Sequence, residues 1–211
     1  MKQLIILLLV SIGLMGVEFD IAVQEYNKGA YIKALDVFYT LAKEGNVKAQ
    51  YNVAMIYENG KGLKANRKEA MYWYEKAAKQ ENPQAQYNLA QIYHEYGEKN
   101  PHDYKKAKYW YEKAVSNGIM QAYNNLAALY LQGKGVKKDE QKAFELFQKA
   151  ANMGDASAQF NVAVLYAWGK NITHDKMKAY ENLKKALNAG KSDASEYLDK
   201  LCDESAWVCK D

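Results

Sequence analysis

The sequence predicts an all-α protein, an α/α solenoid in which one pair of helices is repeated along the chain. The main observation is a nine-residue segment, AQYNLAQIY, whose altered copies begin at intervals of 36, 37, 36 and 36 residues. The chain also has only two prolines, and its apolar residues recur three and four positions apart, as on one face of a helix. The five copies begin at Ala49, Ala85, Ala122, Ala158 and Ala194.

Residues 1–16 have the features of a secretory signal peptide. Lys2 supplies the positive end, and Leu4 to Val10 is an unbroken apolar run that small residues follow. Cleavage is expected after Gly13 or Gly16. The apolar run is short for a membrane span, although an uncleaved anchor is the alternative. We therefore expect an exported protein, periplasmic or secreted, with no membrane insertion after signal cleavage.

The rest of the chain divides into helix pairs. Residues 17–48 are expected to form an N-terminal pair with a short turn around Gly29. Four repeats of two helices follow, and residues 194–211 are expected to form a capping helix and a cysteine-containing tail. The repeats cover residues 49–84, 85–121, 122–157 and 158–193.

In each repeat the nine-residue segment lies on the first helix, and the second helix carries an apolar stripe. In the first repeat this stripe runs from Ala70 to Ala77 with the spacing i, i+3, i+4, i+7. Glu69, three residues after Asn66, would complete a capping box. Residues of the types that cap helix N-termini precede all four second helices: Asn66, Asp103, Asp139 and Asp175.

The loops between the two helices contain glycines that suit a positive φ after a helix C-terminus. They recur at the repeat period without the form GxxxxGK[ST], so we interpret them as turns and not as a phosphate-binding loop. The loop from Tyr96 to Pro101 is one residue longer, and a repeat-specific loop is where individual function can reside. The glycines are Gly60, Gly62, Gly133, Gly135 and Gly169.

The tail contains the two cysteines of the chain, Cys202 and Cys209. On a continuous helix, residues seven apart lie about 10 Å apart along the axis, whereas a disulfide needs Cα atoms within about 7 Å. A disulfide therefore requires the last helix to end at about residues 203–205 and the tail to fold back. Export favours the disulfide over two free thiols. Trp207 is expected to cover the last hydrophobic face beside it.

Three motifs of the repeats resemble those of the Sel-one-like repeat family, a relative of the tetratricopeptide repeats. They are A-Q-Y-N-L-A-x-x-Y, then G-K-G-V, then D-x-x-K-A-x-x-x-F-x-K-A-A. The resemblance covers Ala49 to Ala194 as four copies, and the N-terminal pair looks closer to an ordinary tetratricopeptide unit. It implies an α/α solenoid that binds proteins or peptides, as do secreted or periplasmic adaptors in bacteria.

A secreted subgroup of this family, the Helicobacter cysteine-rich proteins, looks similar too. Its members carry a disulfide between residues eight apart in each repeat, and the subgroup's activities include penicillin binding and a β-lactamase assignment. This chain has no cysteine at the matching positions, so that hallmark is missing. The positions are Ala42 and Gln50, Ala78 and Gln86, Val115 and Tyr123, and Ala151 and Gln159.

If the helices stack as in tetratricopeptide proteins, the first helices line a concave groove. One asparagine then recurs once per repeat: Asn52, Asn88, Asn125 and Asn161. An amide can donate to and accept from the main chain of an extended peptide, and asparagines at this place in tetratricopeptide grooves contact bound peptides. The alternative is that these asparagines form hydrogen bonds within the protein.

Aromatic and polar side chains accompany this asparagine ladder. Tyr51, Tyr87 and Phe160 lie beside it, Gln91 lies one helical turn away, and Trp168 is a candidate for an exposed anchor. Rigid apolar area next to amides suits a peptide groove. Packing between helices is the alternative for the aromatic residues.

Other functions find less support in the sequence. Acidic and basic residues are interspersed with a net charge of +4, so nucleic acid is not an expected partner. Three histidines without ligand spacing indicate no metal site and no cofactor. The leading hypothesis is a non-enzymatic adaptor for a protein or peptide partner. The alternatives are an envelope hydrolase of the β-lactamase or penicillin-binding type, for which Thr40 to Lys43 is a near-match to S-x-x-K, and a structural spacer.

Overall fold

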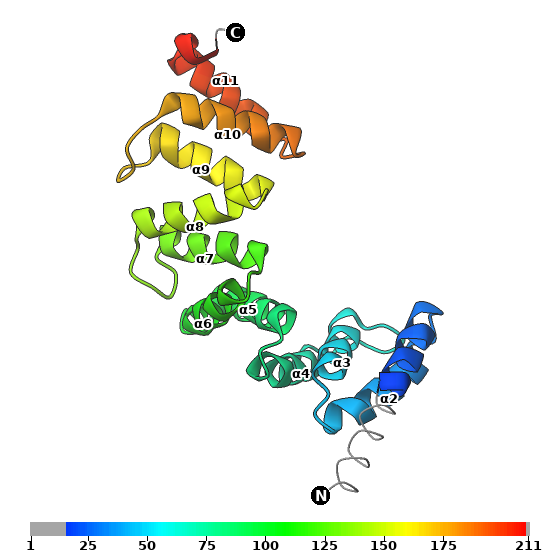
Figure 1. Cartoon of the computed structure of the whole chain (residues 1–211). Coiled ribbons are helices and arrows are strands. Elements are labelled where there is room, and N and C mark those ends of the chain that lie inside the picture. Colours follow the sequence, from blue (N-terminus) through cyan, green and yellow to red (C-terminus); the bar gives the residue numbers. More distant parts are fainter. Residues whose placement is uncertain (1–15, 210–211) are drawn as a thin grey trace, which may run out of the picture. The chain divides into compact units, whose positions relative to one another are not determined.

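The computed structural model describes residues 16–209 (Figure 1). The expected signal peptide therefore lies outside the described residues except for Gly16. The described residues divide into two compact units, residues 16–89 and residues 90–209, and each is described separately below. All regular elements between residues 16 and 209 are helical, so the predicted all-α solenoid is confirmed.

Unit 1 contains the N-terminal helix pair and the first repeat. Residues 16–27 are helical, α2 packs against α3, and α3 packs against α4. The first half of α5, up to residue 89, closes the unit. The helices are α2 (Tyr31–Lys43), α3 (Val47–Asn59), α4 (Arg67–Lys79) and α5 (Pro83–Gly97).

Unit 2 contains the rest of α5 and the remaining helices, and Figure 1 shows α7 to α11 following one another as a stack. From α6 to η1, each helix packs against the next one along the chain. The helices are α6 (Asp103–Ser116), α7 (Met120–Gln132), α8 (Glu140–Asn152), α9 (Ala156–Trp168), α10 (Lys176–Asn188), α11 (Ala194–Glu204) and the 3-10 helix η1 (Ala206–Cys209).

The core of both units is built from the repeated apolar positions. The alanine that opens each copy of the nine-residue segment is fully buried in all five copies. One large side chain per second helix fills the space between neighbouring helices, and its fractional exposure is at most 1 %. Because burial of such side chains stabilises each helix pair by several kcal/mol (about 1.5–3 per residue), these positions explain why the chain folds. They are Phe38, Tyr74, Tyr111, Phe147 and Leu183.

Three of the four predicted caps of second helices are confirmed, and one is wrong. The side chains of Asn66, Asp139 and Asp175 each accept a hydrogen bond from the backbone three residues later. Asp103 instead lies inside α6, because His102 before it already has helical angles. Its carboxylate accepts from Lys106 Nζ at 2.8 Å and from Asn100 Nδ2 at 3.1 Å. The longer loop before α6 thus begins the helix differently.

The predicted capping box at Asn66 is only half formed. The Asn66 side chain accepts from Glu69 N at 3.3 Å, but the backbone N–H of Asn66 donates to the Tyr57 carbonyl at 2.8 Å, so Glu69 is not its acceptor. Caps of first helices, which the sequence analysis did not identify, are made by Asn46, Asn82 and Asp155.

Four of the five loop glycines adopt the predicted left-handed backbone, with φ of 64°, 74°, 73° and 71° at Gly60, Gly62, Gly133 and Gly135. The prediction for Gly169 is wrong, since its backbone is extended with φ −66° and ψ 140°. The loop that follows is held by Glu140, whose carboxylate accepts from the backbone N–H groups of Lys170 and Asn171. This contact directs the chain away from the helix without a left-handed residue.

Glutamine side chains join positions that carry disulfides in the cysteine-rich subgroup. The Nε2 group of Gln50 donates to the Ala42 carbonyl at 3.1 Å, and that of Gln86 donates to the Ala78 carbonyl at 3.2 Å. Both glutamines are buried, so each hydrogen bond satisfies a group that water does not reach. Gln159 makes the same bond to the Ala151 carbonyl at 3.4 Å in unit 2.

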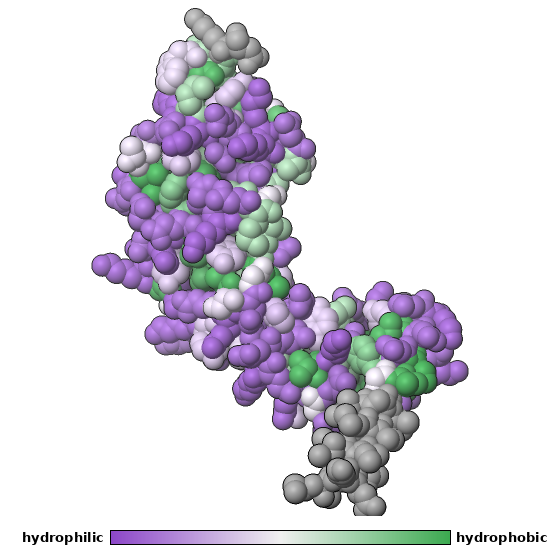
Figure 2. Space-filling model, in the orientation of Figure 1, coloured by the Kyte–Doolittle hydropathy of each residue, from purple (hydrophilic) through white to green (hydrophobic). Residues whose placement is uncertain are grey.

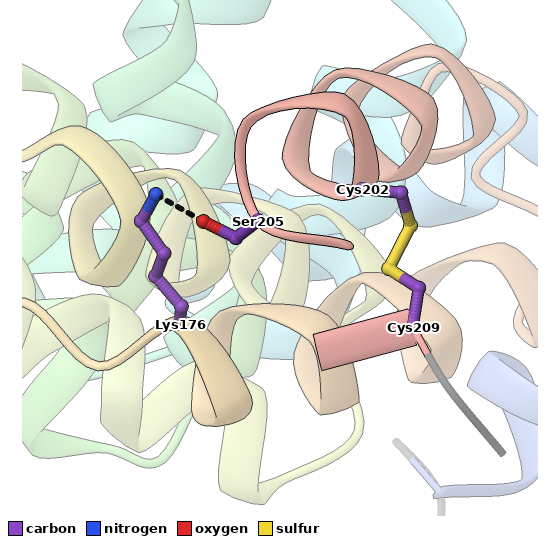
Figure 3. The surroundings of a disulfide bond; sticks show 4 residues. All are labelled: Lys176, Cys202, Ser205 and Cys209. Carbon is purple, nitrogen blue, oxygen red and sulfur yellow. Dashed lines mark hydrogen bonds between the residues drawn. A yellow bond between two sulfur atoms is a disulfide. The ribbon is translucent and has the colours of Figure 1, made fainter. Parts of the chain in front are cut away.

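The C-terminal tail folds back as predicted. Helix α11 ends at Glu204, and a disulfide joins Cys202 to Cys209 with a Cα–Cα distance of 5.7 Å (Figure 3). Lys176 Nζ on α10 donates to the Ser205 hydroxyl at 2.6 Å and ties the turn to the preceding helix. The expectation for Trp207 is wrong, because it is 62 % exposed. Val208, the next residue, is buried in its place, since η1 turns the indole outward.

Candidate binding surface

The predicted binding residues lie on or next to the first helices, and three asparagines of the ladder, Asn88, Asn125 and Asn161, each belong to a three-residue set. We call this set a rung. A rung consists of three residues. The first is the asparagine, and the second is the large residue 14 positions before it, on the preceding second helix. The third lies on the preceding first helix, six positions after that helix's own ladder asparagine. The acceptor of the asparagine's amide hydrogen bond differs from repeat to repeat, and it depends on the type of the large residue.

The rung of unit 1 is a chain of hydrogen bonds through Asn88, Tyr74 and Glu58. Asn88 Nδ2 donates to the Tyr74 hydroxyl oxygen at 3.0 Å, and that hydroxyl donates to Glu58 Oε2 at 2.6 Å. The ring of Tyr51 packs on the ring of Tyr74, with centroids 5.8 Å apart. Short bonds to a carboxylate are among the stronger hydrogen bonds in proteins. The carboxylate of Glu58 is therefore held in one orientation.

The rung of unit 2 also contains an asparagine and a tyrosine, but its third residue is a histidine instead of a glutamate. Asn125 Nδ2 donates to the Tyr111 hydroxyl oxygen at 3.3 Å, and that hydroxyl lies 3.4 Å from His94 Nδ1. His94 contacts the edges or faces of two rings, those of Tyr104 and Tyr111. The Glu58 position is thus occupied by an imidazole in unit 2.

Where the large residue is phenylalanine, the asparagine finds another partner. Asn52 follows Phe38, and its Nδ2 donates to the Lys48 carbonyl of its own helix at 2.9 Å. Asn161 follows Phe147, and its Nδ2 donates to Asn124 Oδ1 at 3.1 Å. All four ladder asparagines therefore use one amide hydrogen within the protein. The sequence contained the signal for this difference, because the repeat position is tyrosine at 74 and 111 and phenylalanine at 38 and 147.

Burial and neighbouring charges shift the pKa of one side chain in each of these two rungs. Burial, followed by the Glu58 carboxylate, raises the pKa of Tyr74 well above its usual value, so the phenol stays a donor. Burial, followed by the Lys134 ammonium, lowers the pKa of His94, while Glu98 and Glu95 oppose this effect. The imidazole of His94 is accordingly neutral at pH 7, whereas the rung of unit 1 ends in a carboxylate.

The aromatic residues beside the ladder divide into two groups. Tyr51, Tyr87 and Gln91 are half-buried on α3 and α5. Phe160 is half-buried as well, but it contacts the capping helix: Tyr197 of α11 packs on its ring with centroids 4.7 Å apart, and Lys191 Nζ lies over it at 5.5 Å. In the last repeat the aromatic residue beside the ladder therefore also packs against α11.

Trp168, predicted as an exposed anchor, is half-buried, and its binding role stays a prediction. Its indole is half-buried against the last hydrophobic cluster and lies 5.8 Å from the ring of Tyr197. Its Nε1 donates to Glu204 Oε2 at 3.0 Å. Trp168 therefore packs against the capping helix α11. The sequence predicted this helix but not its contact with Trp168.

The residues considered for hydrolysis are engaged in local contacts. The hydroxyl of Thr40 donates to the Asp36 carbonyl in its own helix at 3.1 Å. The ammonium of Lys43 lies 4.4 Å from the centre of the Tyr39 ring. The geometry around Thr40 therefore gives no support to the hydrolase alternative.

The described residues can also be considered as sites for metal ions and as membrane-spanning segments. Between residues 16 and 209, no group of three or more His, Cys, Asp or Glu residues is arranged to hold a metal ion. No helix in that range combines the length and apolarity needed to span a bilayer. Figure 2 shows a largely hydrophilic surface with hydrophobic surface over the N-terminal helices, where Val17, Ile21 and Ile32 are exposed.

A family model described as the Sel1 repeat matches the chain four times. The matches cover residues 47–82, 83–119, 121–155 and 156–191. Each begins near the start of a first helix and ends just after a second helix, so the repeat unit of the model is the helix pair seen here. No curated protein sequence matches the chain.

Two solved structures are similar over most of the chain. A protective antigen of uropathogenic Escherichia coli strains, which displays an SLR fold, is 32% identical with a TM-score of 0.80. The match covers 90% of this chain and 42% of the antigen, so this chain spans less than half of that protein. A Sel1 repeat protein from Oxalobacter formigenes is 27% identical with a TM-score of 0.76, and the match covers 92% of this chain and 81% of that one.

Proposed function

Because the chain belongs to the Sel1 repeat family, we propose that it is an exported scaffold whose first-helix face binds an extended segment of a partner protein. Sel1 repeat proteins serve generally as scaffolds for protein–protein interaction. The observation that carries the finer proposal is the rung. Two rungs place oriented hydrogen-bonding groups next to half-buried aromatic side chains on the first-helix face.

The composition of this face suits an extended peptide. A peptide main chain offers alternating N–H and C=O groups. Amides and carboxylates that are already oriented can form hydrogen bonds with these groups and lose little conformational entropy on binding. Tyr51 and Tyr87 add rigid apolar area, which contributes much of the affinity in protein interfaces. The asparagines orient the rungs, so we assign them a positioning role as well as the binding role predicted from sequence.

Site-specific photo-crosslinking in cells tests where the partner binds. A benzophenone amino acid replaces Tyr51 or Tyr87 on first helices and, as matched controls, Tyr72 or Tyr109 on second helices. All four changes replace one aromatic residue by another, and the control tyrosines are each 50 % exposed. We expect Tyr51 and Tyr87 to capture the same protein and the controls to capture nothing. Capture from Tyr72 and Tyr109 alone would contradict the proposal.

Export is tested separately by the N-terminal sequence of the protein recovered from the envelope or the medium. We expect the mature chain to begin at Leu14 or Val17. Recovery only from the cytoplasm, with residues 1–13 retained, would rule out export by signal cleavage.

A further inference from the structure

A buried acceptor in unit 2 has no donor, and its residue lines a cavity. The Oε1 atom of Gln159 on α9 is shielded from solvent, and among residues 16–209 no group donates a hydrogen bond to it. Gln159 lines an open cavity of about 630 Å³ between α8 and α10, the second helices of successive repeats. We propose that this cavity binds a neutral segment of a partner protein through its main-chain N–H groups, with Gln159 as one acceptor. The site is separate from the first-helix face, so the inference does not depend on the proposed function.

The first repeat shows what the oxygen of Gln159 lacks. Gln50 occupies the same repeat position, and its Nε2 donates to a carbonyl eight residues earlier, as that of Gln159 does. Gln50 Oε1 accepts from Nε2 of Gln80, the residue that follows α4, at 2.8 Å. The residue that follows α10, 30 positions after Gln159, is Ala189. Because a methyl group cannot donate, the sequence of the fourth repeat leaves the oxygen of Gln159 unused.

This unused oxygen favours binding of a donor. Buried polar groups nearly always have a partner, and a group without one destabilises the fold. A ligand donor therefore gains more from Gln159 than from an exposed amide that water already satisfies. The side chain is half-buried and lines the cavity. Since the last side-chain torsion of a glutamine is soft, a small rotation brings the oxygen to a group in the cavity.

Two further amides of the cavity wall also leave their oxygens unused. Gln148 Nε2 donates to Asn152 Oδ1 at 3.0 Å, and Asn182 Nδ2 donates to the Lys178 carbonyl at 2.8 Å. Within the described part of the chain, no group donates to the side-chain oxygens of Gln148 and Asn182. The wall therefore holds three amide acceptors, which suits a ligand that carries several N–H donors.

The charges of the cavity wall favour a neutral ligand. Lys178 forms an ion pair with Asp175 at 3.2 Å. Lys185 lies four residues after Glu181 on α10, the spacing at which opposite charges are neighbours on a helix. With both ammonium groups balanced in this way, a charged ligand gains little. The main chain of an extended peptide segment supplies N–H donors that carry no charge, and it supplies several of them in succession.

A neutral octapeptide of alternating alanine and serine, with blocked termini, tests the site. It is titrated into the purified full chain, and binding is followed by the NMR signals of the side-chain amides of Gln148, Gln159 and Asn182. The comparison peptide has the same sequence with a methyl group on alternate main-chain nitrogens, which removes N–H donors. We expect the first peptide to shift these signals and the methylated peptide to bind at least about tenfold more weakly. Absence of a shift with the first peptide, or equal binding of the two, would overturn the proposal.

Ala189→Gln separates binding from packing. The new amide stands where Gln80 stands in the first repeat, so it donates to Gln159 from within the chain. We expect a higher melting temperature and about tenfold weaker peptide binding. Ala189→Met, with a side chain of similar length and no donor, should leave the affinity unchanged. Gln159→Met removes the acceptor itself and should weaken binding by the same factor. If Ala189→Gln and Gln159→Met both bind the peptide as the wild type does, Gln159 does not contact the ligand and the inference fails.

Discussion

The rung of unit 1 and the rung of unit 2 are built on the same repeat positions, yet they present different groups. Asn88 and Asn125 each donate to a buried tyrosine hydroxyl, and the two tyrosines occupy the same place in α4 and α6. The next residue is Glu58 in one rung and His94 in the other. One substitution per repeat at a half-buried site therefore changes which hydrogen-bonding group the repeat holds there.

The largest expected effect is on stability, from Tyr74→Phe. This change removes the hydroxyl that Glu58 and Asn88 share, and both would lose a partner in a partly buried place. We expect a loss of about 1–3 kcal/mol in the free energy of unfolding, measured by urea denaturation. Steric strain is not the cause, because Phe147 occupies the same position in α8. A loss below about 0.3 kcal/mol would show that the rung of unit 1 does not stabilise the fold.

The converse change, Phe147→Tyr, sharpens the comparison by adding a hydroxyl where no rung exists. At the repeat position that Glu58 holds in unit 1 this repeat has Leu131, which is not an acceptor, so we expect a cost of about 1–2 kcal/mol. The double variant with Leu131→Glu supplies the acceptor and should regain about 1 kcal/mol of that cost. Equal stability of the single and double variants would argue that the three positions do not form a unit.

A smaller effect is expected from Tyr111→Phe. Its hydroxyl makes longer hydrogen bonds, 3.3 and 3.4 Å, than that of Tyr74, and its partner is a neutral imidazole. We expect a loss of about 0.5–1.5 kcal/mol in the same urea experiment. A loss greater than that of Tyr74→Phe would reverse the order of the two rungs.

The smallest effect is the pH dependence that His94 confers. Burial lowers its pKa in the folded state, so the unfolded chain binds the proton more readily. The stability contributed by neutral His94 is fully present above about pH 6.5 and is lost as the pH falls through the lowered folded pKa. We expect the wild-type melting temperature to fall more than that of His94→Gln between about pH 7.5 and pH 5. Parallel curves would contradict this account of His94.

The sequence predicted the repeats, the helices and the disulfide with its folded-back tail, because these depend on local periodicity and on chain geometry. It predicted the position of the asparagine ladder but not its partners. Those depend on whether a residue 14 positions earlier, Tyr74 or Phe38 for example, carries a hydroxyl. The errors at Asp103, Gly169 and Trp207 arose where a longer loop, a carboxylate from another helix or a sharp turn overrode local preference.

The central claim is that a rung contacts the partner directly. A double-mutant cycle tests it most directly, combining Glu58→Gln with single replacements in a peptide that reproduces the partner segment captured from Tyr51. Affinities are measured by isothermal titration calorimetry. The account predicts a coupling energy of about 1.4 kcal/mol or more, a tenfold effect on the dissociation constant. A coupling energy of zero at every position of the peptide would contradict it.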